Sequence, residues 1–190
     1  MVQITNIKEN NDAKHHQRQS ESITFRLDNT FLNKLHYEAA RKDISVNTLV
    51  SHIIRRHFDW HSNAAEAGFV TVRRGLLSNL ISRIPEKEIS SIAEYIAKTE
   101  TKDFVLLLRN EYNIESALDV IETWIKISGY PYRHEVNYTQ HSYVIQHDMG
   151  KNWSLYLAEL YRFLFKEFGL KSVEFDLNQN SLVFVVDLER

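Results

Sequence analysis

The chain contains no cysteine among its 190 residues. A disulfide framework is therefore impossible, as is any site built on a cysteine nucleophile or a cysteine metal ligand. No uninterrupted apolar run approaches the length of a membrane helix, and the first twenty residues lack the basic and then apolar pattern of a secretion signal. We therefore expect a soluble, cytoplasmic protein that does not enter a membrane.

Glycine is scarce, and the patterns of common catalytic loops are missing. The five glycines are isolated along the chain, at positions 68, 75, 129, 150 and 169. A glycine-rich phosphate loop is thus excluded, and neither HExxH nor GxSxG occurs. Because no nucleophile has an obvious base near it in the sequence, we expect a protein that is not an enzyme and needs no cofactor.

Positively and negatively charged side chains are nearly equal in number, and the formal net charge is −2. Up to Ser62 the chain carries 9 Lys and Arg against 7 Asp and Glu, and the remainder carries 14 against 18. Six of the nine histidines also precede Ser62. This mild asymmetry favours contact of the N-terminal part with a polyanion.

The composition predicts two folded parts. The four segments that we expect are a flexible arm at 1–20, a strand-helix-helix domain at 21–61, a linker at 62–68 and an α+β domain at 69–190.

A strand pattern stands alone near the N-terminus. Apolar and polar side chains alternate there with the period of a β-strand, so that the two faces differ. The apolar face consists of Ile23, Phe25 and Leu27, and the polar face of Ser22, Thr24 and Arg26. A lone strand leaves its backbone donors and acceptors unpaired, so another strand must pair with it.

Two short amphipathic helices follow this strand. Asp28 suits the N-cap of the first, which ends near Arg41 and Lys42. Ser45 suits the N-cap of the second, whose apolar stripe continues to Phe58. One strand and two helices bury too little apolar surface to fold alone.

A second copy of the chain would pair the lone strand and would also enlarge the buried apolar surface. An antiparallel strand from an identical chain pairs the backbone and gathers both apolar faces over four helices. The polar faces then form a two-stranded ribbon whose width fits the DNA major groove, where arginine reads guanine. The start of the second helix, at residues 45–47, offers backbone N–H groups to a phosphate.

The segments "SITFRL" and "ISVNTLVSHII", with the helix between them, resemble the ribbon-helix-helix DNA-binding domain of the Arc and methionine repressors. The resemblance covers about residues 22–60 and implies an intertwined homodimer that binds double-stranded DNA. The base contacts that it implies are those of Ser22, Thr24 and Arg26, and the sugar-phosphate contacts are those of Ser45, Val46 and Asn47. The chain has "DNT" where many members have a proline, and Asp43 with Ile44 where a glycine often precedes the second helix.

The remaining residues predict an α+β domain. Helical spacing of apolar residues occurs in four places, 76–84, 89–96, 104–108 and 114–125, the last stopping near Gly129. After these helices the pattern returns to strands and indicates an antiparallel ββαββ-like arrangement.

The strand region leaves one alternative open. Residues 132–148 form either one long strand or a hairpin with a turn at Thr139 and Gln140. Residues 152–168 predict an amphipathic helix, and residues 173–188 predict a hairpin.

Histidines supply the few chemical candidates of this domain, namely His134, His141 and His147, with Asp148 beside them. Histidine and carboxylate groups bind zinc or nickel, and nickel-responsive members of the resembled family carry a C-terminal sensor. On a single strand, however, His141 and His147 would lie ~20 Å apart, too far for one ion. We therefore favour histidines at the surface or in hydrogen bonds, and expect no metal.

Aromatic residues are the other candidates, as the wall of a ligand cage or as core. They are Tyr130, Tyr132, Tyr138, Tyr143, Trp153, Tyr156 and Tyr161. We favour the core.

The sequence thus predicts a homodimeric, sequence-specific transcriptional regulator. Repression is favoured because a dimer on a promoter blocks polymerase without further machinery. The second domain implies another role, either the binding of a small-molecule or protein effector or assembly into larger oligomers. The alternatives are an antitoxin-like protein, whose C-terminal segment wraps a toxin, and a regulator that responds to a metal or a small molecule.

Overall fold

The computed structural model describes residues 21–170 and 173–189. The chain divides into two compact units, residues 1–46 and 47–190. The flexible arm predicted for residues 1–20 lies outside the described residues.

The described part of the first unit consists of an extended segment and one helix. Residues 21–28 are exposed and irregular, and α1 follows at Asn29–Arg41. Asp28 caps α1, because its carboxylate accepts a hydrogen bond of 2.7 Å from the Thr30 backbone N–H. The predicted cap and end of the first helix are confirmed, whereas the pairing of the strand ahead of it stays a prediction.

The chain leaves α1 through Asp43, which adopts the left-handed conformation with φ of 52°. The Asp43 N–H donates to the Ala40 carbonyl at 3.2 Å, and the Ile44 N–H donates to the Ala39 carbonyl at 3.1 Å. These are the two hydrogen bonds of a Schellman motif, in which glycine usually takes the left-handed position. Asp43 therefore adopts the conformation that a glycine favours, and the turn forms without one.

The second unit begins with a helical rod that changes its hydrogen-bonding pattern near its end. Its segments are α2 at Val46–Arg56, the π-helix η1 at His57–His61 and α3 at Ser62–Ala64. Trp60 is buried, and its ring packs edge-on against Phe69 and Phe104, with centroids 5.1 and 5.3 Å away. Arg56 donates to the carbonyl of Ile127 at 3.2 Å. These contacts hold the end of the rod to the helices that follow.

Four more helices occupy the middle of the chain, as the apolar spacing predicted. They are α4 at Arg74–Ile81, α5 at Glu86–Thr99, α6 at Thr101–Arg109 and α7 at Ile114–Ser128. Pro85 stands just before α5, where its missing N–H costs nothing. Gly129 ends α7 with φ of 68°, in agreement with the predicted stop.

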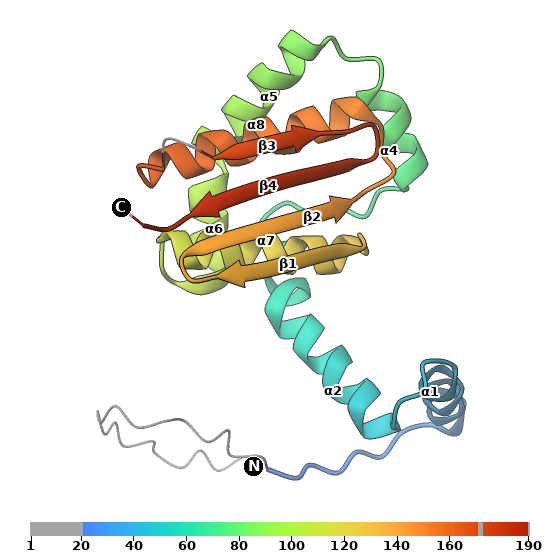
Figure 1. Ribbon diagram of the computed structural model, residues 1–190. Coiled ribbons are helices and arrows are strands. Elements are labelled where there is room, and N and C mark those ends of the chain that lie inside the picture. The colour runs from blue at the N-terminus through green and yellow to red at the C-terminus, as the bar shows by residue number, and fades with distance from the viewer. Residues whose placement is uncertain (1–20, 171–172, 190) are drawn as a thin grey trace, which may run out of the picture. The chain divides into compact units, whose positions relative to one another are not determined.

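A four-stranded antiparallel sheet and one helix complete the unit (Figure 1). The strands are β1 at Tyr132–Asn137, β2 at Gln140–Gln146, β3 at Glu174–Leu177 and β4 at Ser181–Asp187, and α8 at Lys151–Glu167 joins β2 to β3. Their order in the sheet is β1-β2-β4-β3. The α+β class and the ββαββ arrangement are confirmed.

The structure decides between the two alternatives for residues 132–148. They form a hairpin in which Asn137 pairs with Gln140, so the turn lies at Tyr138 and Thr139, one residue earlier than expected. The register matters because a shift by one residue would turn every side chain of β2 to the other face.

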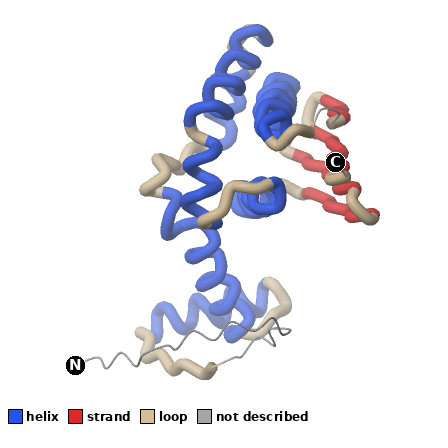
Figure 2. Tube along the Cα trace, turned by 90° about the vertical axis from the view of Figure 1, so that its left-hand side faces the viewer, coloured by secondary structure: helices blue, strands red, loops and turns tan. Residues whose placement is uncertain are grey.

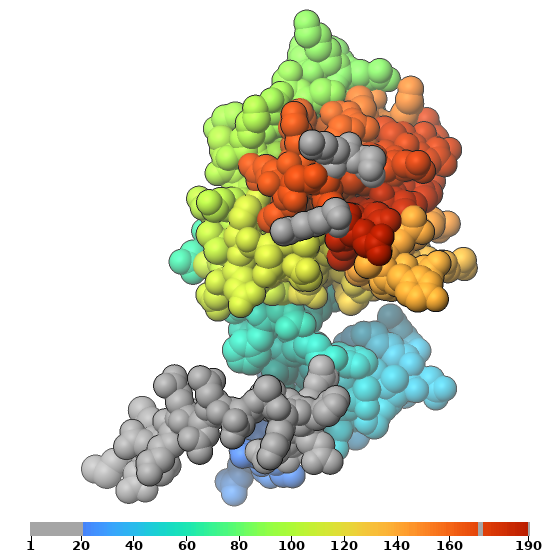
Figure 3. Space-filling model, turned by 60° about the vertical axis from the view of Figure 1, so that its left-hand side comes forward, coloured from blue at the N-terminus to red at the C-terminus, as the bar shows by residue number. Residues whose placement is uncertain are grey.

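The core lies between the sheet and the helices α7 and α8, which cover one of its faces (Figures 1 and 2). The strand residues that point into it are fully buried: Tyr143, Ile145, Leu182, Phe184 and Val186. Helix α5 packs on α8, and α6 packs on both α5 and α7. Figure 3 shows α6, α7 and α8, in yellow-green to orange, gathered on one face of this unit.

Most of the aromatic group belongs to this core, as predicted. Tyr130, Tyr143, Trp153 and Tyr161 are buried. Tyr138 is the exception, because it lies at the hairpin turn and is 97% exposed. Among the described residues, no helix is both long and apolar enough to cross a membrane.

Candidate functional site

The residues predicted to contact DNA bases lie in the extended segment ahead of α1. The side chains of Ser22, Thr24 and Arg26 are exposed. In a β-strand these three would share one face, opposite the apolar side chains, because side chains alternate along a strand. The segment can therefore present a polar face, with Arg26 as its only cation.

The residues predicted to contact the sugar-phosphate backbone surround the start of α2. Ser45 and Asn47 are exposed and Val46 is half-buried at the first position of the helix. The first backbone N–H groups of a helix have no partner inside it and carry partial positive charge. Such a helix start suits a phosphate oxygen.

The histidines of the second unit fall into two separate groups. The hairpin brings His134 and His141 together, with Nε2 of the first and Nδ1 of the second 3.1 Å apart. His147 lies elsewhere, at the end of β2, and the neighbouring Asp148 is exposed. Within residues 21–170 and 173–189, no group of three histidine or acidic side chains is arranged to hold a metal ion.

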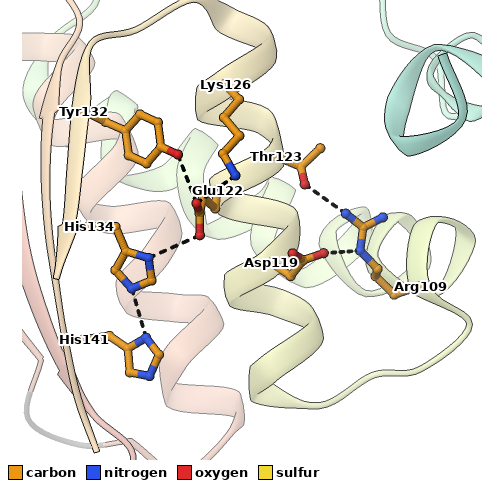
Figure 4. A network of polar contacts seen from close by, with 8 residues as sticks. All are labelled: Arg109, Asp119, Glu122, Thr123, Lys126, Tyr132, His134 and His141. Carbon is orange, nitrogen blue, oxygen red and sulfur yellow. Dashed lines mark hydrogen bonds and ion pairs between the residues drawn. The ribbon is translucent and has the colours of Figure 1, made fainter. Parts of the chain in front are cut away.

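His134 and His141 belong to a chain of polar contacts that ends on Glu122 of α7 (Figure 4). One oxygen of Glu122 accepts from Tyr132 at 3.0 Å and pairs with Lys126 at 2.8 Å, and the other lies 3.2 Å from His134 Nδ1. Burial alone would raise the pKa of the Glu122 carboxyl, but hydrogen bonds from Lys126 and Tyr132 lower it overall. The ionised carboxylate only accepts, so His134 Nδ1 donates to it.

Both imidazoles take part in this network through their ring nitrogens. His134 Nε2 and His141 Nδ1 share one hydrogen bond between the two rings. Burial and then the neighbouring His134 lower the pKa of His141, which keeps that ring neutral at pH 7. The network therefore ties the edge strand β1 and its neighbour β2 to α7. Sequence reasoning missed Glu122, because nothing local links a helix residue to a strand ten residues later.

A second polar contact joins neighbouring helices in the same region. Arg109 at the end of α6 pairs with Asp119 and donates to the Thr123 hydroxyl at 2.9 Å, both on α7 (Figure 4). The contact holds the end of α6 to α7, and residues of both helices line the cavity described below.

His147 and Ser154 form a contact that resembles a nucleophile with its base, with Nε2 and Oγ 2.8 Å apart. The Met149 backbone N–H donates to His147 Nδ1 at 3.1 Å, so the ring proton is on Nε2. His147 thus donates to Ser154, whose hydroxyl donates in turn to the Asn178 carbonyl at 2.6 Å. Burial lowers the pKa of His147 and keeps the ring neutral.

Both side chains are fully buried, and neither is set up for catalysis. The nitrogen that faces Ser154 already carries a proton and cannot take another from it. The contact instead joins the end of β2 to α8 and to the turn between β3 and β4. The sequence did not predict the contact between His147 and Ser154, because it depends on how α8 packs against the sheet.

Replacing Ser154 by alanine should therefore destabilise the fold. The change leaves the buried His147 N–H without an acceptor, and we expect the free energy of unfolding to fall by about 1–3 kcal/mol. Denaturant unfolding followed by circular dichroism measures this. Ser90→Ala on α5 is the control, because its hydroxyl makes one long hydrogen bond of 3.4 Å. Equal stability of the two variants would contradict the role of Ser154.

A cavity of about 670 Å³ lies among α5, α6, α7 and α8. The segment that leads from α3 to α4 borders it through Glu66, Ala67 and Phe69. Its walls are mostly apolar and aromatic, which is typical of sites for small organic molecules. The sequence predicted the aromatic residues as core and did not predict an opening between them.

The chain matches no protein-family model, no curated protein and no solved structure with which it was compared. Its function is therefore inferred from its own residues.

Proposed function

We propose that the protein is a homodimeric, sequence-specific DNA-binding transcriptional regulator that acts as a repressor. The observation that carries this proposal is the exposure of Ile23, Phe25 and Leu27, which are 72%, 53% and 48% exposed in the single chain. Three large apolar side chains on one side of one extended segment form a surface that a partner is expected to cover.

A second copy of the chain is the partner that also satisfies the backbone. Residues 21–28 are extended and lack a strand neighbour among the described residues. Two such segments, paired antiparallel across a two-fold axis, exchange hydrogen bonds and bury both apolar faces together. The apolar side chains then lie inside the dimer, and Ser22, Thr24 and Arg26 of both copies lie outside.

Helix α2 and the π-helix η1 that continues it carry a matching apolar surface. Ile53, Ile54 and Phe58 are 48%, 40% and 67% exposed, although the spacing along the helix predicts one continuous apolar stripe. In a dimer of the ribbon-helix-helix type, this stripe packs around the paired strands. Exposed apolar residues on both segments support the same mode of assembly.

The polar face of the ribbon suits double-stranded DNA. A two-stranded ribbon enters the major groove, where Arg26 reaches a guanine edge and Ser22 and Thr24 reach other base edges. Backbone N–H groups around residues 45–47 anchor a phosphate at each end and set the register of the ribbon. Repression then follows when the bound dimer covers a promoter.

The antitoxin-like alternative fits the second unit less well. A toxin-wrapping segment is usually short and folds only on its partner. Residues 74–188 instead contain helices and a sheet around an extensive core of their own. A folded second unit favours a regulator that receives a signal there, or one that assembles into larger oligomers.

Genome-wide footprinting of the full-length protein tests this proposal and identifies the operator. We expect protection of short, two-fold symmetric sites upstream of genes, with an affinity that falls steeply as salt rises. Protection without sequence preference, or none at all, would overturn the proposal.

Arg26→Ala then tests the direct reading of bases. We expect binding to the identified operator to weaken by ~1–3 kcal/mol, with relaxed preference at one base position in each half-site. Titration of fluorescent operator variants measures both effects. Arg133→Ala on β1 is the control, because this arginine is also exposed and its ion pair with Glu135 is long, at 3.8 Å. Unchanged operator binding by Arg26→Ala would remove this residue from the interface.

A further inference from the structure

The cavity of the second unit has aromatic walls. Trp124 and Trp153 face each other with ring centroids 6.4 Å apart, and Tyr156 stacks on Trp153 at 5.2 Å. Phe69 and Phe104, 4.7 Å apart, form another part of the lining. Broad aromatic faces of this kind attract flat apolar molecules and organic cations.

Two polar groups in the lining are buried without a hydrogen bond. The indole nitrogen of Trp153 and the hydroxyl of Tyr161 have no partner among the described residues, and the two residues are 8% and 3% exposed. The indole N–H interacts with the Tyr130 hydroxyl, but no hydrogen bond of normal geometry joins them. Both atoms are almost inaccessible to solvent, so they lie behind the cavity wall and do not face its open space.

Charge in the lining has one sign. Glu66, Glu100 and Asp103 border the cavity, and no lysine or arginine is present among the described residues that line it. All three carboxylates are exposed, so they lie where the cavity meets solvent. Their combined field attracts a cation and repels an anion.

We propose that this cavity is a binding site for a small, flat aromatic cation. The aromatic body of the ligand lies against Trp124, Trp153 and Tyr156. Its charge lies toward the acidic opening. The size fits, because cavities of 300–1,000 Å³ commonly hold a drug-sized molecule. This site goes beyond the proposed regulator and does not rest on DNA binding.

Three fluorescent probes test the chemistry of the site on the full-length protein. Berberine is a flat aromatic cation with ether oxygens, N-phenyl-1-naphthylamine is neutral, and 1-anilinonaphthalene-8-sulfonate is the same scaffold with a negative charge. We expect saturable one-to-one binding of berberine, and binding of the sulfonate at least about tenfold weaker than that of its neutral analogue at low salt. Sulfonate binding as tight as that of the neutral analogue, or no saturable berberine binding, would overturn the proposal.

A pair of variants on α6 tests the location. Leu107 lines the cavity, whereas Leu106 is equally half-buried but does not. Leu107→Trp fills the cavity and should abolish berberine binding, and Leu106→Trp should leave it within about twofold. Circular dichroism checks that both variants fold. Berberine binding retained by a folded Leu107→Trp, or lost equally in both variants, would place the probe elsewhere.

The acidic opening is tested by the double variant Glu100→Gln with Asp103→Asn. We expect it to remove most of the discrimination against the sulfonate and to weaken berberine severalfold at low salt. A chain that binds berberine in this way but binds no DNA would overturn the regulator proposal alone. Binding to operator DNA without any probe binding would overturn the cavity proposal alone.

Discussion

Replacing Phe25 by glutamate is expected to turn the full-length dimer into a monomer. In the proposed ribbon the Phe25 side chains of both copies are enclosed near the two-fold axis, so the variant would bury two unpaired carboxylates there. An uncompensated buried charge costs about 3–5 kcal/mol, so the dimer should dissociate at least a hundredfold more readily. Sedimentation equilibrium across micromolar concentrations measures the change, and operator binding should be lost with the dimer.

Thr24→Glu is the matched control, because it places the same charge one residue earlier. On extended backbone neighbouring side chains point to opposite faces, so this glutamate would project toward DNA and leave the dimer interior unchanged. We expect a normal dimer that no longer binds the operator. A dimeric Phe25→Glu protein, or identical behaviour of the two variants, would contradict the ribbon.

The second large effect is expected in the core of the other unit. Phe184 is fully buried on β4, and its ring lies 4.7 Å from that of Tyr143, 5.4 Å from Tyr161, and 5.9 Å from each of Phe165 and Phe175. Truncation to alanine removes all four contacts and leaves a cavity that the surrounding strands cannot close. We expect Phe184→Ala to lower the free energy of unfolding by about 3–5 kcal/mol.

Thermal and denaturant unfolding of the full-length protein measure this loss. Tyr95→Ala is the control, since this aromatic residue of α5 is 62% exposed and its truncation should change stability by less than about 0.5 kcal/mol. A small effect at Phe184 would mean that the sheet and α8 are not held together through this residue.

Local patterns predicted much of the fold because they reflect local physics. Asp28 caps α1 and Gly129 ends α7, and each acts through hydrogen bonds to residues within five positions. The alternation of Phe175 and Leu177 with Phe184 likewise identified a hairpin, because a strand with one buried face repeats every two residues. Such features depend on neighbours in the sequence and can be predicted without knowing the rest of the structure.

Features that join distant segments were not predictable in this way. The turn at Tyr138 depends on which faces of β1 and β2 meet the helices, and a local pattern does not contain that choice. The Glu122 network and the contact of His147 with Ser154 arise where α7 and α8 pack on the sheet. The sequence around a titratable residue does not show which distant residue will contact it in the folded protein.

The sequence by itself determined helix starts and stops, the C-terminal hairpin and the alternation of apolar and polar residues from Ser22 to Leu27. Each follows from backbone hydrogen bonding and side-chain period within a few residues. Only the tertiary structure decided that aromatic residues expected as solid core also surround a cavity, with Trp153 and Tyr161 left without hydrogen-bond partners among the described residues. Packing between helices α5 to α8 sets that space, because the distances between elements depend on all side chains in contact and not on the pattern of any one.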